Sequence, residues 1–195
     1  MKASSLLRLL KKAIPVLLVG AVLLGRKKKA KKSLPFVKKA SKRENVLQWL
    51  EPVRAAVARH PGATVPLVLG VMQLESGGNP NAMNFDKAGN PFAQGLMQLI
   101  PITQKGLGVT DPLDPEQSIE GGTKLLASNM NRYHGSVEYA LAAYNQGPKY
   151  IDPLYEKGAP LVFQRKNKKG ELITKDVRPY VAIVLANMAA YKDYK

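Results

Sequence analysis

Apolar residues recur at helical spacing along most of the chain, and glycines, prolines and capping residues interrupt them at short intervals. Ser41 with Glu44 three residues later forms a capping-box pattern, and the apolar residues after it predict a helix reaching Val53. Thr64 predicts the N-cap of a second helix that ends after Ser76, where two glycines follow.

The second half of the chain predicts three more helices and one hairpin. Asp114 followed by proline predicts a helix start, Ser136 predicts the cap of a helix ending at Gly147, and Pro179 opens the last helix. Residues 161–174 predict a β-hairpin that turns around residues 167–170. We therefore expect a mainly α-helical fold with one small hairpin.

Charge divides the chain into two parts. Its 195 residues carry a net charge of +16, and residues 1–43 contribute 14 Lys or Arg and no acid, which leaves residues 44–195 near neutrality. A nucleic-acid-binding role is therefore not expected of the body, residues 44–195. The chain has no Cys, which excludes a disulfide framework, a thiolate zinc site, a thiol nucleophile and a lipid-modified Cys.

The N-terminal arm, residues 1–43, contains an apolar segment at residues 13–25 between lysine clusters. As a helix its 13 residues would span about 20 Å, less than the roughly 30 Å hydrocarbon core of a bilayer, and Pro15 would disturb it. A lysine run replaces the small residues of a signal cleavage site, so cleavage is not expected. The heavier basic flank, residues 26–32, favours a cytoplasmic side that would hold the body inside with it. The arm is either a membrane-inserting or anionic-lipid-binding anchor or a disordered basic tail.

The sequence gives little support for a metal site or for a Ser-His-acid catalytic triad. His60 and His134 are the only histidines, and neither has a partner at metal-ligand spacing. No glycine-rich loop follows a strand in the way that phosphate binding requires. No cofactor and no metal ion are therefore expected.

Glu75 is the candidate catalytic acid. Val68, Val71 and Met72 precede it by seven, four and three residues, so the carboxyl group projects from the apolar face of its helix. Burial and the negative end of the helix dipole both disfavour the charged form and predict a raised pKa, as a general acid needs. The alternative is an exposed glutamate at a frayed helix end.

Three separated blocks carry a family resemblance: Glu75-Ser76-Gly77-Gly78, Gln94-Gly95-Leu96-Met97-Gln98-Leu99-Ile100-Pro101 and Ala142-Ala143-Tyr144-Asn145-Gln146-Gly147-Pro148. With the Asp114–Ile119 helix start and the Tyr180-Val181 pair, they make residues 65–191 resemble the SLT-type lytic transglycosylases. The resemblance implies their helical lysozyme-like fold, shared with goose-type lysozyme, for the catalytic domain at residues 44–195.

The resemblance also implies roles for single residues. Glu75 would be the catalytic acid and later the base, Ser76 would contact the sugar, and Gln98 would hydrogen-bond the substrate. Tyr144 and Asn145 would line the cleft beside Glu75. The implied reaction cuts the β-1,4 bond from N-acetylmuramic acid to N-acetylglucosamine in peptidoglycan and yields a 1,6-anhydro-muramyl product.

Two local features depart from the family pattern. Asp86 lies in a long polar loop, residues 84–92, where it is either a turn residue or a second carboxylate that would permit a hydrolytic muramidase reaction. The predicted hairpin carries a basic group that could grip acidic stem peptides or wall polymers, or form a solvated edge: Arg165, Lys166, Lys168 and Lys169.

Two other classes of function remain as alternatives. The fold could bind glycan without cutting it, although binding alone needs no half-buried acid. The protein could instead be a membrane- or nucleic-acid-associated assembly protein that acts through its arm. In the leading interpretation the enzyme acts on peptidoglycan in the bacterial cell envelope. A phage particle or secretion apparatus would carry it there, and the arm would contact a membrane or particle proteins.

Overall fold

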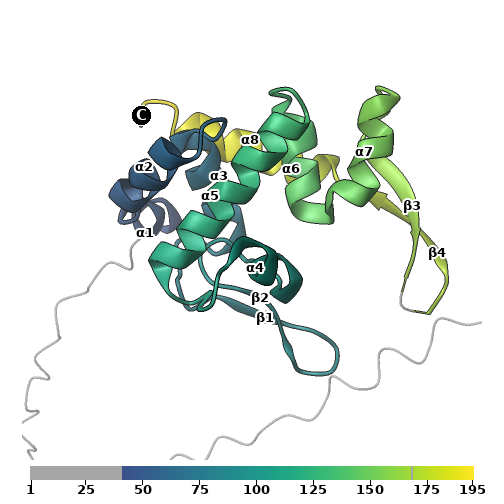
Figure 1. The fold of residues 1–195 in the computed structure, drawn as a ribbon, viewed down its shortest axis with the longest axis horizontal. Coiled ribbons are helices and arrows are strands. Elements are labelled where there is room, and N and C mark those ends of the chain that lie inside the picture. The colour runs from purple at the N-terminus through teal and green to yellow at the C-terminus, as the bar shows by residue number, and fades with distance from the viewer. Residues whose placement is uncertain (1–40, 168) are drawn as a thin grey trace, which may run out of the picture. The chain divides into compact units, whose positions relative to one another are not determined.

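The structure, a computed structural model, describes residues 41–167 and 169–195, which form helices and two antiparallel hairpins (Figure 1). The predicted apolar arm segment, residues 13–25, lies outside the described residues, as does Lys168. In chain order the elements are α1 (Lys42–Leu47), α2 (Leu50–Arg59), α3 (Val65–Glu75), β1 (Met83–Phe85), β2 (Pro91–Gln94), α4 (Pro101–Leu107), α5 (Pro115–Arg132), α6 (Val137–Gln146), α7 (Pro148–Glu156), β3 (Val162–Lys166), β4 (Leu172–Asp176) and α8 (Arg178–Ala190).

The capping residues explain where several helices begin. The Ser41 hydroxyl accepts from the Glu44 N–H at 3.2 Å, and the Ser41 N–H donates to the Glu44 carboxylate at 2.6 Å, so the predicted capping box is confirmed. Thr64 and Asp114 each accept from the N–H three residues later, at 3.4 and 2.8 Å. The prediction for Ser136 was wrong in one respect: α6 follows it, but its side chain makes no capping hydrogen bond.

The helix expected from Ser41 to Val53 is two helices, because the chain breaks at residues 48–49 between α1 and α2. Helices α4 and α7 were not predicted. Each begins with a proline, Pro101 and Pro148, which suits the first turn of a helix because its N–H would have no partner there. Pro148 thus ends α6 and starts α7, where the sequence pattern indicated only an end.

A second hairpin was also not predicted. Strands β1 and β2 pair antiparallel across residues 84–92, the segment expected to be a polar loop, with a register irregularity between Asn84 and Phe85. The predicted hairpin is confirmed: β3 and β4 pair in register from Val162–Asp176 to Lys166–Leu172. The mainly α fold class is also confirmed.

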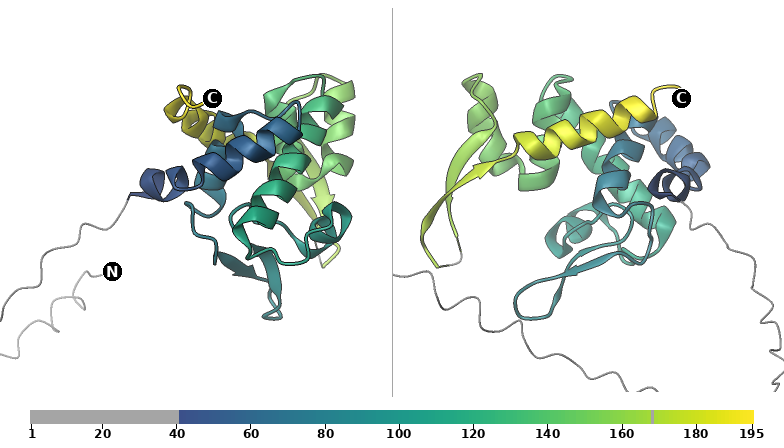
Figure 2. Two further views of the ribbon diagram at one scale, coloured as in Figure 1. Left: turned by 60° about the vertical axis from the view of Figure 1, so that its left-hand side comes forward. Right: turned by 180° about the vertical axis from the view of Figure 1, so that it is seen from behind.

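Helix α3 forms the centre of the core. Apart from Pro66, every residue from Val65 to Met72 in α3 is buried, so this helix is covered on most sides. Helix α8 packs along it and runs from the β3–β4 hairpin back toward α1 and α2 (Figure 2). Gly70 permits this close packing, because a Cβ there would lie 2.8 Å from the Met188 side chain. This packing between elements far apart in the sequence fixes α3 relative to α8.

No helix among residues 41–167 and 169–195 combines the length and the apolar character that a membrane crossing requires. Helix α5, with 18 residues, has the necessary length but carries charges along it, including Glu116, Glu120 and Lys124. The predicted membrane-active segment of the arm is not among these residues.

Candidate active site

Glu75 is the last residue of α3, and its side chain is partly buried. The Tyr180 hydroxyl, from the first turn of α8, donates a 2.7 Å hydrogen bond to Glu75 Oε1. Burial raises the pKa of the Glu75 carboxyl because the charged form loses hydration, and the Tyr180 hydrogen bond only partly offsets this. The net shift is upward, as the apolar face of the helix predicted, so Glu75 stays protonated to a higher pH than an exposed glutamate.

A second tyrosine, Tyr144, lies close enough to Glu75 to feel its charge. Tyr144, near the end of α6, donates a 2.6 Å hydrogen bond to the Met97 carbonyl. Burial raises the pKa of Tyr144 and of Tyr180 well above the usual value, and the negative charge of Glu75 raises both further. Both phenols therefore remain protonated hydrogen-bond donors across the physiological range. The structure thus brings together Glu75 and Tyr144, two of the predicted site residues.

The loop after Glu75 is held from behind by the α1–α2 junction. The Trp49 indole N–H donates a 3.0 Å hydrogen bond to the Gly78 carbonyl. Gly78 has φ +80°, and a Cβ there would lie 2.3 Å from the Asn45 carbonyl oxygen, so only glycine fits. The Ser76 hydroxyl bridges the loop by donating to the Met72 carbonyl and accepting from the Gly78 N–H. Its predicted contact with sugar stays a prediction.

Ser76 also borders a surface hollow of about 490 Å³ beside this loop. Polar side chains of α1 and of the α1–α2 junction form its other wall, among them Lys42, Asn45 and Gln48. The loop therefore presents a polar concave surface next to Glu75, the candidate acid.

Gln98 is nearly buried, with 8% of its surface exposed, and its side chain makes three protein hydrogen bonds. Its Nε2 donates to the Ala82 and Gly95 carbonyls at 3.0 and 2.9 Å, and its Oε1 accepts from Asn84 Nδ2 at 2.7 Å. These bonds tie the β1–β2 hairpin to the turn before α4. The predicted hydrogen bond to substrate stays a prediction, and it would have to use the remaining lone pair of Oε1.

The other two predicted residues are Asn145, which is exposed, and Asp86, which is partly buried. Asn145 is exposed beside Tyr144, and its Oδ1 accepts from Gln146 Nε2. Asp86 Oδ1 accepts from the backbone N–H groups of Ala88 and Asn90 at 2.8 and 3.0 Å, the pattern of a turn residue. Its suggested role as a second carboxylate stays a prediction.

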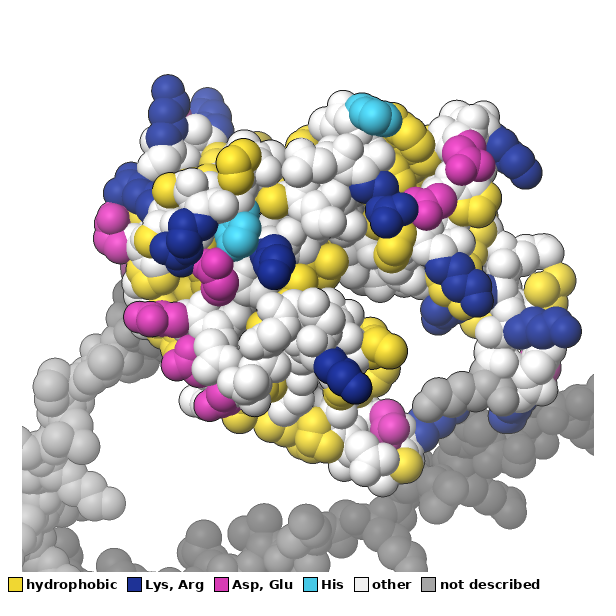
Figure 3. Space-filling view, in the orientation of Figure 1, with side chains coloured by type: hydrophobic (Ala, Val, Ile, Leu, Met, Phe, Trp, Pro, Cys, Tyr) yellow, Lys and Arg dark blue, Asp and Glu magenta, His cyan; other side chains and the backbone are white. Residues whose placement is uncertain are grey.

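Glu75 lies shortly before the β1–β2 hairpin in the chain, and Tyr180 lies shortly after the β3–β4 hairpin. Strand β1 starts eight residues after Glu75, and β4 ends four residues before Tyr180. Figure 3 shows an open hollow between the lobe that carries β1, β2 and α4 and the β3–β4 hairpin. No group of His, Cys, Asp or Glu in the described ranges could hold a metal ion. The groups that the structure brings together at Glu75 are a carboxyl group and tyrosine hydroxyls.

The family model described as the Transglycosylase SLT domain matches residues 53–154, just over half of the chain. The chain belongs to the SLT transglycosylase family. A relative called "Transglycosylase" from Enterobacteria phage PRD1 is 48% identical over 101 residues, which cover 52% of this chain and 36% of the phage protein. The membrane-bound lytic murein transglycosylase F of Shewanella loihica is 39% identical over 84 residues, 40% of this chain and 17% of that protein. The match thus spans much less than two thirds of either relative.

Solved structures of lytic transglycosylases share the fold of this SLT family member. The 70-kDa soluble lytic transglycosylase in complex with bulgecin A has a TM-score of 0.58 and 21% identity, over 76% of this chain and 25% of that chain. An inactive mutant of Slt from Pseudomonas aeruginosa has a TM-score of 0.53 and 21% identity, over 72% and 23% of the two chains. At this identity the likeness concerns the fold, and it confirms the predicted lysozyme-like helical domain.

Two residues that contact the candidate site of this SLT family member were not predicted to do so. Tyr180 was assigned to the apolar pattern of the last helix, although the Tyr180-Val181 pair was part of the family resemblance, and it lies outside the matched residues 53–154. Trp49 was assigned to a helix face. In each case the partner is far away in sequence, 105 and 29 residues, so helical spacing carried no signal for the contact.

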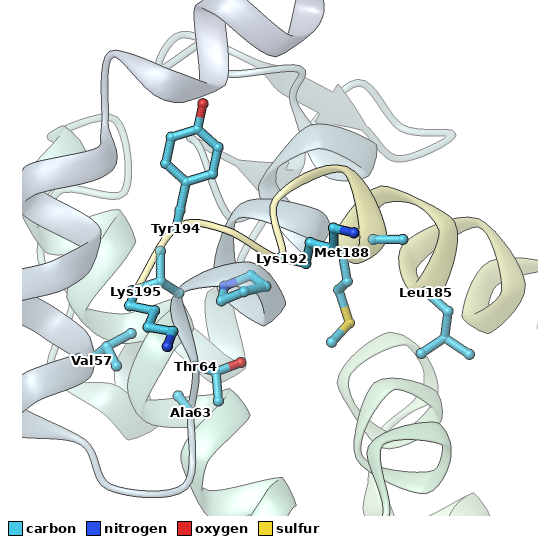
Figure 4. A pocket seen from close by; sticks show the side chains of 11 residues that line it. Val57, Ala63, Thr64, Leu185, Met188, Lys192, Tyr194 and Lys195 are labelled. Carbon is cyan, nitrogen blue, oxygen red and sulfur yellow. The ribbon is translucent and has the colours of Figure 1, made fainter.

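A second, apolar hollow of about 700 Å³ lies at the other end of α3 (Figure 4). Val57 from α2, Pro66 from the start of α3, and Leu185 and Met188 from α8 line it, with Tyr194 from the C-terminal tail. Pro66 and Glu75 are nine residues apart on one helix, about 14 Å along its axis. This apolar hollow is therefore separate from the candidate active site around Glu75.

Proposed function

We propose that the protein is a peptidoglycan lytic transglycosylase that cleaves the β-1,4 bond from N-acetylmuramic acid to N-acetylglucosamine. The observation that carries the proposal is the half-buried Glu75 carboxyl, whose pKa is raised and which a tyrosine hydroxyl orients, in a chain of the SLT family. The names of the phage and bacterial relatives support the same reaction class. Holding an acid in this environment costs stability, and catalysis gives a reason for it.

In the first step protonated Glu75 gives its proton to the glycosidic oxygen. The bond from the anomeric carbon to that oxygen breaks, and N-acetylglucosamine leaves with a free hydroxyl group. Positive charge develops on the muramic acid ring, where the sugar's own N-acetyl group can stabilise it in place of a second carboxylate. The Tyr180 hydroxyl favours the carboxylate that Glu75 becomes, so it helps this transfer.

In the second step the Glu75 carboxylate acts as the base. It takes the proton from the 6-hydroxyl of the muramic acid residue, and that oxygen bonds to the anomeric carbon. The product is the 1,6-anhydro sugar, Glu75 is protonated again, and no water is consumed. One carboxyl group therefore suffices for both steps, in keeping with the turn role of the Asp86 carboxylate.

The test is mass spectrometry of purified peptidoglycan digested with the full chain. Anhydro-muramyl fragments are the expected product. Reducing-end muramic acid would overturn the transglycosylase outcome and make Asp86→Asn the next variant for a hydrolytic mechanism. Binding to peptidoglycan with no fragments from a folded protein would instead favour the glycan-binding alternative.

We also propose that the enzyme acts in the cell envelope as a component of a phage particle. The 48% identity to the PRD1 protein over 101 residues supports this, together with the uncleaved basic arm expected from the sequence. The expected observation is the intact chain, arm included, in purified particles that digest peptidoglycan. Export of the chain and processing by an ordinary secretion route in its native host would contradict the proposal.

A further inference from the structure

A stacked aromatic pair with two cations lies where α7 meets β3. The rings of Tyr150 and Phe163 are 5.1 Å apart between centroids, with planes 15° apart. The Arg165 guanidinium lies 5.6 Å and the Lys149 ammonium 5.9 Å from the centroid of the Tyr150 ring. Cations within about 6 Å of a ring centroid are attracted by its π-electrons. The Tyr150 ring therefore has two positive groups within about 6 Å of its centroid.

The strand register adds a third cation. Phe163 lies opposite Lys175, and Arg165 lies opposite Ile173. Residues two apart on a strand share a face, and directly paired residues share it too, so these four side chains lie on one face of the hairpin. All four are partly buried, whereas Lys166 on the other face is exposed. The half-buried face is thus distinct from the solvated edge that the sequence allowed.

These three cations have no acidic partner among residues 41–167 and 169–195. The ion pairs of this part of the chain involve other basic residues, and neighbouring Asp176 pairs with Arg178 instead. Arg165 and Lys175 share one partly buried face, where like charges repel each other more strongly than in water, and the exposed Lys149 lies over the same Tyr150 ring as Arg165. A bound anion would relieve this repulsion, so the face is suited to an acidic ligand.

The cluster is joined closely to the candidate active site on both sides. Lys149 follows Tyr144 by five residues, and Lys175 precedes Tyr180 by five. Five residues span at most about 18 Å. The Cα atom of Lys149 therefore lies within that distance of the Cα atom of Tyr144, and the Cα atom of Lys175 within the same distance of that of Tyr180. In Figure 3 the β3–β4 side of the open hollow carries Lys and Arg side chains. A ligand attached to a sugar near Glu75 could therefore reach them.

We propose that Lys149, Arg165 and Lys175, gathered around the Tyr150–Phe163 stack, form a subsite for the carboxylates of the peptide stems of peptidoglycan. The proposal rests on the proposed function, because it takes peptidoglycan as the substrate. Muramic acid carries these short peptides, and an extended four-residue peptide reaches about 13 Å. The cations bind the carboxylates, and the flat ring surface contacts apolar side chains of the stem.

The test compares two double variants of the full chain that remove the same charge from the same hairpin. Arg165→Gln with Lys175→Gln removes two cations of the subsite. Lys166→Gln with Lys169→Gln removes two exposed cations outside it and serves as the matched control. Each is assayed on polymer-free peptidoglycan with intact stems and on glycan strands from which an amidase has removed the stems.

The subsite variant should raise KM on stem-bearing peptidoglycan about tenfold and leave stem-free strands unaffected, since two partly buried charge pairs are lost. The control pair should stay within about twofold of the wild type on both substrates. Equal effects of the two double variants, or a loss that persists on stem-free strands, would overturn the subsite. Sedimentation with stem-free walls that retain anionic polymers is a third assay. A binding loss of the subsite variant seen only there would also overturn the subsite and would assign the cations to those polymers.

Failure of the proposed function gives a different pattern. If the wild type cleaves neither substrate but sediments with stem-bearing peptidoglycan, and only the subsite variant loses this binding, the reaction is wrong and the subsite stands. If the wild type cleaves both substrates and the subsite variant does so equally well, the reaction stands and the subsite is wrong. Thermal unfolding of both double variants serves as the control for folding: each should unfold in a cooperative transition, as the wild type does.

Discussion

The two ends of α3 differ in what they offer a ligand. At the N-terminal end lies the larger hollow, about 700 Å³, which apolar side chains such as Pro66 and Met188 line with no acid among them. At the C-terminal end Glu75 is partly buried beside two tyrosine hydroxyls. Burial of an apolar side chain stabilises the fold, whereas partial burial of a carboxyl group costs free energy. The costly end, and not the roomier one, is therefore the candidate site of chemistry.

The largest expected effect is the loss of activity in Glu75→Gln. Glutamine keeps the shape and the hydrogen bond from Tyr180 but cannot transfer a proton, so the release of anhydro-muropeptides should fall at least about a thousandfold. Circular dichroism should remain that of the wild type. An active, folded Glu75→Gln protein would assign the chemistry to another residue.

Gly78→Ala should lower the free energy of unfolding by about 3 kcal/mol, because its Cβ would collide with the Asn45 carbonyl at 2.3 Å. Gly89→Ala is the matched control: Gly89 has a similar φ, +83°, but nothing lies within 4 Å of a Cβ there. Urea unfolding should show the control losing only about 1 kcal/mol. Equal losses in free energy of unfolding would mean that the positive φ, and not the close contact with Asn45, accounts for the effect at Gly78.

Tyr180→Phe should lower activity about tenfold to a hundredfold and move the alkaline limb of the pH profile upward. The Tyr180 hydroxyl favours the charged form of Glu75 and so lowers its pKa; removing it lets the pKa rise further. The acid then stays protonated to a higher pH, but its conjugate base loses a hydrogen bond worth about 2 kcal/mol. Tyr191→Phe loses a hydrogen bond to Gln73 in the same helix pair and should leave the pH profile unchanged.

The pH dependence of stability offers a smaller effect at the same end. Because folding raises the pKa of Glu75 above 4.5, the native state holds a proton that the unfolded state has released. Wild-type stability should therefore fall, relative to Glu75→Gln, as pH rises from 4.5 through the folded pKa. Each unit of pKa shift corresponds to about 1.4 kcal/mol. Parallel stability curves from pH 4 to pH 8 would contradict the burial of this carboxyl group.

Met188→Ala probes the other end and should have the smallest effect. Met188 is partly buried against Gly70 and lines the apolar hollow, so its truncation should cost about 1–2 kcal/mol of unfolding free energy. The value of kcat should stay within twofold of the wild type, because α3 separates this end from Glu75 by about 14 Å. A large fall in kcat with unchanged stability would show that the two ends are coupled.

The sequence predicted those parts of the molecule that local signals specify. Ser41, Thr64 and Asp114 marked helix starts because a capping side chain bonds a backbone group three residues away. The partial burial of Glu75 followed from the apolar residues on the same helix face. Both signals lie within one or two helical turns, where spacing alone determines which groups meet.

The remaining elements depend on longer-range contacts. Strand β1 has three residues and an irregular register, so its pattern was too short to distinguish from a loop. Tyr180 meets Glu75 only because α8 packs against α3, a contact between residues 105 positions apart. The Gln98 amide bonds three groups that come together only in the folded domain, so no local signal predicted these bonds, and its hydrogen bond to substrate stays a prediction.

The bond from Trp49 to Gly78 has a practical consequence. The chain contains a single tryptophan, and its indole N–H is anchored to the loop that follows Glu75. Tryptophan fluorescence of the unmodified protein therefore reports from one known position near Glu75, the candidate catalytic acid. Movement of this loop when a glycan binds should shift the emission, so the protein carries its own optical probe for titrating substrates and inhibitors without a label.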